Sequence, residues 1–460
     1  MHNIVFLAHF LVTVAGLLGI FWASRYPLLA GGFSFDRNMP TWATVLAVVV
    51  MVAFTGIGFR LSSPPEWFWD FTRAYYSAGR DVAQGDLAAL QILIREGATG
   101  GFVNIPIVAY LFAPFGILPP QISGVLFTIL GLALTALAWL LLVRLAKLDV
   151  PERWILALLF IANGPLLTGI KFGNLSYVIL AALAGGLLLI RSGRSGAAGA
   201  LIGLAVVIKP VLILVGLFFL LRRDWRGVLA FAAVGLATAL LSLIVFGWDE
   251  NLAWFQNCIV QYSRNWLPTF SVQSISAFLL RLNAEAKISE WILVPPTHIQ
   301  KLVVQAITGL FFVAAALACL KSAKAGAGQE QVSQLSDERR DLQYMLVISL
   351  CLVTSPLAWS HYYAWLLLPT AFFLKSHATG EIPPVARWAG WAAIICVTPL
   401  NGWPTLISNP LLMDIYRSLF MSHMLWGGLI WFGLIVWWLA GKGGHLSSHK
   451  SEKGGTQITV

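Results

Sequence analysis

The stretch AAGALIGLAVVIKPVLILVGLFFLL, residues 197–221, is apolar throughout except at Lys209. Pro210 follows directly, and proline ends or kinks a helix because it lacks an amide proton and its ring clashes with the preceding turn. Basic residues flank both ends of the stretch: Arg191, Arg194, Arg222, Arg223 and Arg226. Since short loops rich in Lys and Arg face the cytoplasm, we expect the chain to enter a membrane and return to the same side, with Lys209 at the turn of two short helices.

The rest of the chain is equally apolar. Of its 460 residues, 58% are hydrophobic and 11% are charged, whereas soluble globular domains carry roughly 25% charged residues. The mean hydropathy is +0.79. Many apolar runs approach or exceed the ~17 to 25 residues of a spanning helix, and they lack the two-residue alternation of barrel strands. The sequence therefore predicts an all-α, polytopic transmembrane helical bundle.

Simple spans are expected near residues 3–23, 41–59, 121–143, 154–170, 174–190, 227–246, 301–320, 386–401 and 421–440. A second broken stretch, 343–374, is interrupted by Ser355-Pro356 and by Trp359-Ser360-His361. Broken helices at membrane depth need protein or a wet cavity to satisfy the freed backbone groups. With the two broken stretches counted as pairs, we expect about 11–13 membrane helices, and His361 at the outer tip of its pair.

Charge also assigns the loops to the two sides of the membrane. Further basic clusters mark cytoplasmic segments: Arg144, Lys147 and Arg153; Lys321, Lys324, Arg339 and Arg340. Segments 60–120 and 247–300 are then the two large outer segments. Residues 102–118, which contain Pro106 and Pro114 and are followed by Pro119, should lie along the outer interface. Residues 1–440 form a single transmembrane domain, and 441–460 a flexible cytoplasmic tail. The net charge of +10 fits membrane lipids, and no basic stripe with interleaved aromatics indicates nucleic acid.

Three polar residues are expected to open to the outer side. Asp70 lies in the aromatic stretch WFWDFTRAYYSAGR, residues 67–80, and a carboxylate partly removed from water beside cations has a tunable proton affinity. Lys209 is an intramembrane cation, which is costly and by default a functional hypothesis, and it suits an anionic ligand such as a lipid phosphate. His361 falls on the same face, so the convergence of all three indicates a site.

Each of these residues also has a structural interpretation. Asp70 and Arg73, three residues apart, could form a surface ion pair on a helix. Lys209 could snorkel to the interface, and His361 could be a packing residue. The second outer segment mixes cations with rings that could stack on a sugar or anchor an interfacial helix: Tyr262, Arg264, Trp266, Gln273, Ser274 and Arg281. The four cysteines lack metal-type spacing, so no metal site or disulfide framework is expected.

Taken together, these stretches resemble glycosyltransferase family 87, membrane enzymes of the C-type glycosyltransferase superfamily that use polyprenyl-phosphate sugars. The resemblance runs from about Asp70 to Pro369 and rests on these segments in order: Asp70 with residues 75–80, residues 102–119, Gly173-Asn174, residues 203–210, residues 222–226, Gln273-Ser274 with Arg281, and residues 355–361. The chain departs from the family where it has Asn104-Ile105-Pro106 in place of a Tyr-Pro-Pro type sequence, and Gly173-Asn174 in place of Gly-Gln.

The resemblance implies an inverting glycosyltransferase with the C-type bundle. It would move mannose, or a pentose such as arabinofuranose, from a polyprenyl-phosphate carrier to a glycolipid or cell-envelope glycan. Asp70 would be the general base, and Lys209, His361 and Arg281 would bind the donor phosphate. The implied substrate-lining residues are Trp69, Tyr75, Tyr76, Asn174, Gln273, Ser274 and Trp359. Cations of the chain could stabilise the leaving phosphate without a cofactor or a metal.

The resemblance also implies a location and a set of partners. The protein would be a multi-pass protein of a bacterial inner membrane, with its active site facing the periplasm or the cell exterior. Its partners would be the lipid-linked donor, a lipid or glycan acceptor, and membrane lipids. The main alternative is a secondary transporter, which also uses broken helices and polar groups in the membrane. The hydropathy shows no inverted repeat, and the polar groups gather at one face, which argues against it. A non-catalytic membrane scaffold is a third alternative.

Overall fold

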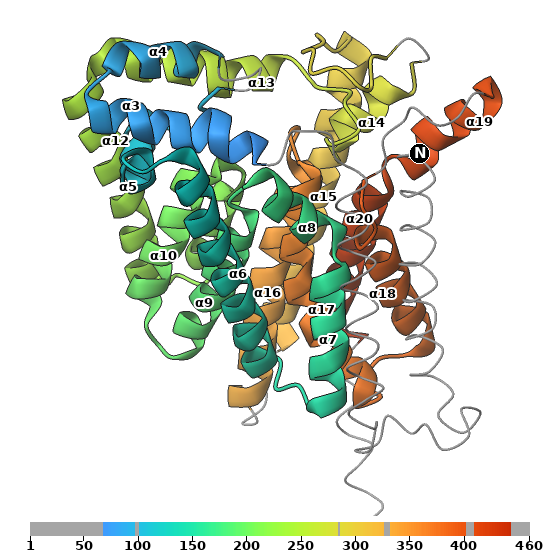
Figure 1. The fold of residues 1–460 in the computed structure, drawn as a ribbon. Helices are drawn as coiled ribbons and strands as arrows, with labels where there is room; N and C mark the ends of the chain where they lie inside the picture. The colour runs from blue at the N-terminus through green and yellow to red at the C-terminus, as the bar shows by residue number, and fades with distance from the viewer. Residues whose placement is uncertain (1–67, 97–100, 284–285, 326–331, 402–408, 443–460) are drawn as a thin grey trace, which may run out of the picture.

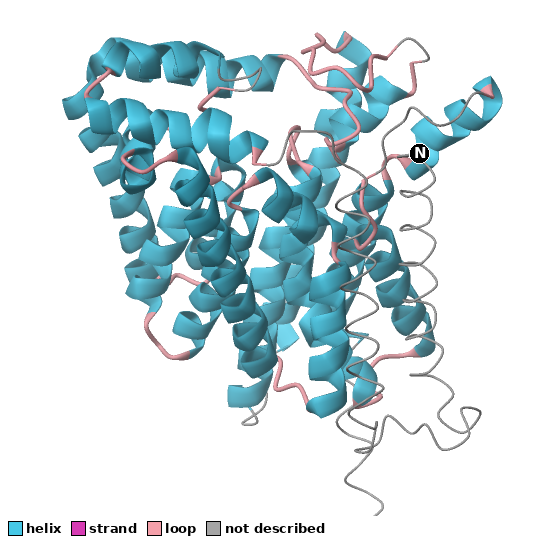
Figure 2. Cartoon of the chain, viewed as in Figure 1, coloured by secondary structure: helices cyan, strands magenta, loops and turns pink. Residues whose placement is uncertain are grey.

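The computed structural model describes residues 68–96, 101–283, 286–325, 332–401 and 409–442. The expected spans 3–23 and 41–59, Trp67 and the tail beyond residue 442 lie outside these ranges. Within them the chain is helical, and the only β-structure is two isolated bridges, Trp266 with Val294 and Val272 with Trp359. Figure 2 shows helices joined by loops in the described part, with the most extended loops at the upper right. The all-α prediction is confirmed.

Four helices in the described part are long and apolar enough to cross a membrane: Pro120–Leu145, Trp225–Arg264, His298–Lys321 and Met413–Gly441. They correspond to α6 (Pro120–Leu145), to α12 (Trp225–Trp254) with its continuation, to α15 (His298–Ala325) and to the region of α20 (His423–Trp437). Shorter apolar helices include α9 (Ser176–Arg191) and α18 (Pro384–Val397). The chain is thus a multi-pass membrane protein, while the total of 11–13 helices stays a prediction.

The expected span 154–170 is not one straight helix. It consists of α7 (Val150–Ala162) and α8 (Gly164–Phe172), which are bent by 49° relative to each other. Asn163 lies between them with an extended ψ of 105°, and its Oδ1 accepts a hydrogen bond of 2.9 Å from the amide of Leu166. An Asn side chain at this position replaces a missing helical partner. The expected span is therefore bent at Asn163, a break that apolarity alone does not reveal.

The stretch 197–221 forms the expected hairpin. Helix α10 (Ser195–Ile208) ends at Lys209, and the chain continues as the 3₁₀ segment η4 (Pro210–Leu214) and α11 (Val215–Leu221). A Cβ on Gly199 would lie 2.2 Å from the carbonyl oxygen of Gly227, and a Cβ on Gly227 would lie 2.3 Å from the Phe219 ring. Residue 199, near the start of α10, and residue 219, near the end of α11, therefore both contact the start of α12. The two ends of the hairpin lie on the same side of the bundle.

The stretch 343–374 forms a second hairpin. Helix α16 (Val332–Thr354) leads to a loop, the 3₁₀ segment η6 (Ser360–Leu366) and α17 (Leu367–Ala378). Near its start Asp341 pairs with Arg191, and near its end Lys375 pairs with Asp149 at 2.9 Å. Arg191 is the last residue of α9, and Asp149 precedes α7 at the end of the bundle where Figure 1 shows the connection between α6 and α7. The tip between α16 and η6 therefore points to the opposite end.

That opposite end carries the two expected outer segments. The first comprises the π-helix η1 (Phe71–Tyr76), α3 (Ser77–Gln84), α4 (Leu87–Glu96), η3 (Pro106–Phe112) and α5 (Ala113–Gly116). The second contains η5 (Phe255–Val260), α13 (Gln261–Arg264) and α14 (Ile275–Arg281). Figure 1 shows α3, α4, α13 and α14 together across the top of the helices. As expected, residues 102–118 do not span; they pack on α3, where a Cβ on Gly79 would meet the Phe112 carbonyl oxygen at 2.3 Å.

Glycine marks the corner between spanning and interfacial chain. Gly247 interrupts α12 with a φ of 74° and a ψ of −179°, a backbone conformation that glycine adopts at little cost. Asn251 donates to the Gly247 carbonyl at 2.7 Å and so satisfies a backbone group at the break. The chain beyond this corner continues through η5 to α13.

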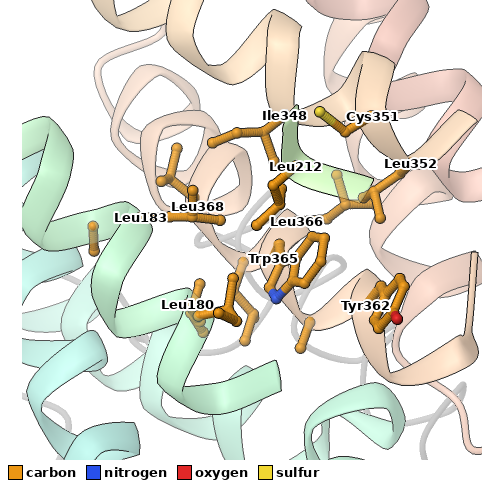
Figure 3. Packing of buried hydrophobic residues seen from close by; sticks show 14 of the residues in the cluster. Leu180, Leu183, Leu212, Ile348, Cys351, Leu352, Tyr362, Trp365, Leu366 and Leu368 are labelled. Atoms are coloured by element: carbon orange, nitrogen blue, oxygen red, sulfur yellow. The ribbon is translucent and has the colours of Figure 1, made fainter. Parts of the chain in front are cut away.

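A dense apolar core lies where the two hairpins meet α9. Figure 3 shows Leu180 and Leu183 of α9, Leu212 of η4, Ile348 and Leu352 of α16, and Trp365 of η6 packed together. Trp365 is fully buried, and its indole nitrogen donates to the Ser176 carbonyl at 3.1 Å. Because the interior is close-packed, the helix breaks next to this core hold their side chains in fixed positions.

Candidate active site

Three of the expected site residues lie at places where a helix ends or is interrupted. The first of these breaks is the turn between α8 and α9. Gly173 adopts a φ of 65°, and a Cβ there would meet the Cβ of Phe71 at 2.6 Å, so η1 packs directly on the turn. Asn174 accepts hydrogen bonds at Oδ1 from the amide and the hydroxyl of Ser176, at 3.2 and 3.0 Å. These bonds fix the amide so that Nδ2 donates to Asp70 Oδ2 at 2.7 Å.

Asp70 lies just before η1, and its half-buried carboxylate accepts that one hydrogen bond. Burial raises the pKa of Asp70 above its ordinary value, while the Asn174 hydrogen bond and the nearby charge of Lys209 lower it. Burial is the largest of these effects, as expected when a carboxylate leaves water. The carboxylate therefore has a raised proton affinity and a cation within electrostatic reach.

The surface ion pair between Asp70 and Arg73 does not form. The Arg73 guanidinium lies instead over the Trp69 ring, 3.4 Å from its centroid. Stacking of this kind is a cation–π contact, and among the described ion pairs none joins Asp70 to Arg73. Asp70 therefore interacts with Asn174 through a hydrogen bond and with Lys209 electrostatically, and not with Arg73.

The second break carries Lys209, which is 6% exposed and has a φ of −132° and a ψ of 86°. Its ammonium lies over the Tyr362 ring, 5.1 Å from the centroid. The near-complete burial of the residue does not fit a side chain that snorkels to water. A buried cation that lies over a ring and within electrostatic reach of the Asp70 carboxylate is the arrangement expected of an anion-binding group.

The third break carries His361, which is 8% exposed. Its ring meets Tyr362 edge-on at 4.9 Å and lies parallel to Trp359 at 6.3 Å. Its Nε2 is buried and has no hydrogen-bond partner within the described part of the chain. Packing therefore fixes the ring, as the structural interpretation expected, and the fold leaves one buried imidazole nitrogen without a partner among the described residues.

Other expected site residues use their polar groups within the fold. Arg281 is fully buried and donates to the carbonyls of Thr269 and Val272 at 3.0 and 2.8 Å and to the Ser422 hydroxyl at 2.8 Å. Gln273 donates to the Phe270 and Met421 carbonyls. Ser274 caps α14 and donates to the Pro356 carbonyl. These bonds tie the second outer segment to the tip of the second hairpin and to the start of α20.

The aromatic residues of the expected set also divide into those near the cluster and those that hold the fold together. Tyr75 stacks on Phe112 at 4.7 Å and lies within electrostatic reach of Asp70 and Tyr362. Tyr76 donates its hydroxyl to the Leu118 carbonyl at 3.0 Å. Trp359 pairs with Val272 in an isolated bridge. Tyr75 therefore lies in the wall of the cluster, whereas Tyr76 fastens the first outer segment.

The structure thus brings together Asp70, Asn174, Lys209 and His361, with two additions that the sequence interpretation left out. Tyr362 links Lys209 to His361, and Trp291 stacks on Trp359 at 5.1 Å while remaining half-exposed. Tyr362 could have been predicted as a site residue from its position next to His361, but nothing in the sequence around Trp291 indicates that it lies near the site. Among the residues with described positions, no three His, Cys, Asp or Glu side chains are grouped so as to hold a metal ion.

The cluster is suited to one kind of chemistry. A carboxylate with raised proton affinity can accept a proton from a hydroxyl. A buried ammonium and an imidazole nearby can stabilise an anion that forms as a bond breaks. Acid–base and anion-stabilising groups within electrostatic reach of one another are the parts needed for group transfer from an anionic leaving group.

Comparison with known proteins identifies the family to which the chain belongs. The sequence model of glycosyltransferase family 87 matches residues 102–337, a range that includes Lys209 and excludes Asp70 and His361. A curated protein of Mycolicibacterium smegmatis (strain ATCC 700084 / mc(2)155), a polyprenol-phosphate-mannose-dependent alpha-(1-2)-phosphatidylinositol pentamannoside mannosyltransferase, is 26% identical over 368 residues. That alignment covers 77% of this chain and 80% of the relative. The chain belongs to glycosyltransferase family 87.

Proposed function

We propose that this membrane glycosyltransferase moves mannose from polyprenyl-phosphate mannose to a glycolipid or cell-envelope glycan at the outer face of the membrane. The observation that carries the proposal is the Asp70 carboxylate, held at 2.7 Å by Asn174 within electrostatic reach of the buried Lys209 ammonium. The name of the mycobacterial relative supports mannose over arabinofuranose. Family membership favours a transferase over the transporter and the scaffold.

Asp70 acts as the general base in this mechanism. It takes the proton from an acceptor hydroxyl while the hydroxyl oxygen attacks the anomeric carbon. The bond from that carbon to the phosphate oxygen breaks on the opposite face, so the configuration at the carbon inverts. Asn174 holds the carboxylate in one orientation, which is the geometric requirement for positioned proton transfer.

Lys209 and His361 receive the leaving polyprenyl phosphate. The phosphate gains negative charge as the sugar departs, and a preplaced cation stabilises that charge strongly in a site that excludes water. Tyr362 keeps the ammonium near its 5.1 Å stacking position. The unpartnered Nε2 of His361 offers a second contact to a phosphate oxygen.

A transfer assay tests the proposal. Full-length protein in detergent is given radiolabelled polyprenyl-phosphate mannose, with and without a lipid extract as acceptor, and a parallel sample receives the arabinofuranose donor. We expect acceptor-dependent release of polyprenyl phosphate from the mannose donor. Labelled donor crossing the membrane of proteoliposomes without any release of polyprenyl phosphate would instead establish the transporter.

A labelling experiment tests the outer-face assignment. Single cysteines replace Asp86, Asn265, Asp224 or Glu338 in a chain without the four native cysteines. Positions 86 and 265 belong to the outer segments and should react with an impermeant thiol reagent from outside the cell. Positions 224 and 338 flank the hairpins at the other end and should not. Reaction of position 86 only from the cytoplasmic side would reverse the whole scheme.

A further inference from the structure

Asn104 joins the first outer segment to the helix break that carries Lys209. It is 2% exposed, and its Nδ2 donates a hydrogen bond of 2.7 Å to the carbonyl oxygen of Ile208. Ile208 is the last residue of α10 and immediately precedes Lys209. Neither the resemblance nor the chemistry of the cluster gave Asn104 a role.

The Ile208 carbonyl needs a partner from outside its helix. In a continued α-helix this carbonyl would accept from the amide of Leu212, but that amide bonds the Lys209 carbonyl at 3.1 Å instead. At membrane depth no water is at hand to replace the missing bond. The side-chain amide of Asn104 fills this place, and its NH₂ group must face the carbonyl because an oxygen there would be repelled.

Asn104 is itself firmly anchored. The Phe102 amide donates to the Leu93 carbonyl at 3.0 Å, and the Trp254 indole donates to the Val103 carbonyl at 3.0 Å. The segment 102–104 is therefore fastened both to α4 and to the interfacial end of α12. A side chain on such an anchored segment can hold the backbone of another element in place.

We propose that Asn104 is a positioning residue that acts through Lys209. By holding the Ile208 carbonyl it fixes the backbone at Lys209, with its φ of −132° and ψ of 86°, and so keeps the ammonium over Tyr362. This inference rests on the proposed function, since it assumes that Lys209 binds the donor phosphate. It adds a residue of the first outer segment to the machinery that binds the donor.

The test separates positioning from support of the fold. Asn104→Leu keeps the size of the side chain and removes the donor, and Asn104→Ser is a smaller variant whose hydroxyl cannot span the same distance. In full-length protein we expect either variant to raise the KM for polyprenyl-phosphate mannose about threefold to tenfold, the loss that one neutral hydrogen bond corresponds to. The kcat at saturating donor should change less than about twofold.

Trp254→Phe is the matched control, because it removes another anchor of the same segment without touching Ile208. Because the Phe102 amide still fastens the segment to α4, Trp254→Phe should raise the donor KM less than Asn104→Leu does. If Trp254→Phe raises the donor KM as much as Asn104→Leu does, the effect is one of general loosening and the proposal is overturned.

A double-mutant cycle completes the test. Asn104→Leu combined with Lys209→Ala should bind the donor no worse than Lys209→Ala alone, because coupled residues are not additive. Additive losses would show that Asn104 does not act through Lys209. If Lys209→Ala raises the donor KM and Asn104→Leu does not, this inference alone fails; if Lys209→Ala itself has no effect, the proposed donor site fails.

Discussion

The two outer segments have similar residues and different uses for them. In the first, Asp70 accepts a single hydrogen bond, and the Arg73 guanidinium is exposed on the Trp69 ring. In the second, the buried Arg281 guanidinium is bonded to backbone carbonyls and to a hydroxyl. Cations beside rings therefore indicate neither catalysis nor structure by themselves. What decides is whether the fold already uses the polar groups.

The contrast follows from the cost of buried polar groups. A donor that is already bonded inside the protein can bind a ligand only by leaving another group unpaired, which costs about 1 to 3 kcal/mol. In the second outer segment, donors such as the Arg281 guanidinium are already bonded within the fold, and these bonds hold the segment on the tip of the second hairpin. In the first outer segment Gly79 packs closely on Phe112, and the Asp70 carboxylate accepts only the hydrogen bond from Asn174.

Asp70→Asn is the sharpest test of the first half of this contrast. The variant keeps the shape of the side chain but removes the proton acceptor, so the single-turnover rate of mannose transfer should fall about 10²- to 10⁴-fold. Donor affinity, measured separately, should be retained. Asp86→Asn removes an exposed charge from the same outer segment and should transfer at the normal rate. Near-normal transfer by Asp70→Asn would end its assignment as the base.

Arg281→Met tests the second half. Removing the guanidinium leaves buried carbonyls unpaired, and hydrogen bonds to charged groups contribute about 1.5 to 3 kcal/mol each, so we expect a loss of stability of at least about 3 kcal/mol. Thermal unfolding in detergent measures this loss, with the exposed Arg264→Met as the control. A stable Arg281→Met protein with weakened donor affinity would instead place Arg281 at the donor phosphate, as the family resemblance implied.

Lys209→Ala tests whether the intramembrane cation binds a ligand, as proposed for Asp70, or supports the fold, as Arg281 does. Loss of a charge-assisted contact of about 1.5 to 3 kcal/mol should raise the donor dissociation constant about tenfold or more. Equilibrium binding of polyprenyl-phosphate mannose is the measurement. Lys287→Ala, which removes an exposed cation of the second outer segment, should bind normally. Unchanged affinity in a folded Lys209→Ala protein would mark Lys209 as structural.

The pH dependence of turnover refines the picture of Asp70. A general base must be deprotonated, so kcat should fall as pH drops through the pKa of Asp70, which burial raises. Asn174→Leu removes the hydrogen bond that lowers this pKa. The acidic limb of the kcat–pH profile of this variant should therefore move to higher pH. Asn163→Ala, which removes a cap on α8 without touching Asp70, should leave the limb in place.

Local sequence determined the two hairpins. The basic residues on both sides of 197–221 and the Lys209-Pro210 break were enough to predict a returning chain, because charge decides the side of a loop and proline decides where a helix stops. The same reasoning placed His361 at the tip of the second hairpin. It did not predict the bend within 154–170, because the hydrogen bond by which Asn163 caps α8 has no signature in hydropathy.

The sequence alone also brought Asp70, Lys209 and His361 to one face, since that conclusion needs only the side on which each segment ends. Only the tertiary structure decided which polar groups are free. The bond from Asn174 to Asp70 and the bond from Asn104 to Ile208 each join residues 104 positions apart. Periodicity and charge are properties of neighbouring residues, whereas these bonds depend on where two separate elements meet in space. Packing alone sets that meeting point.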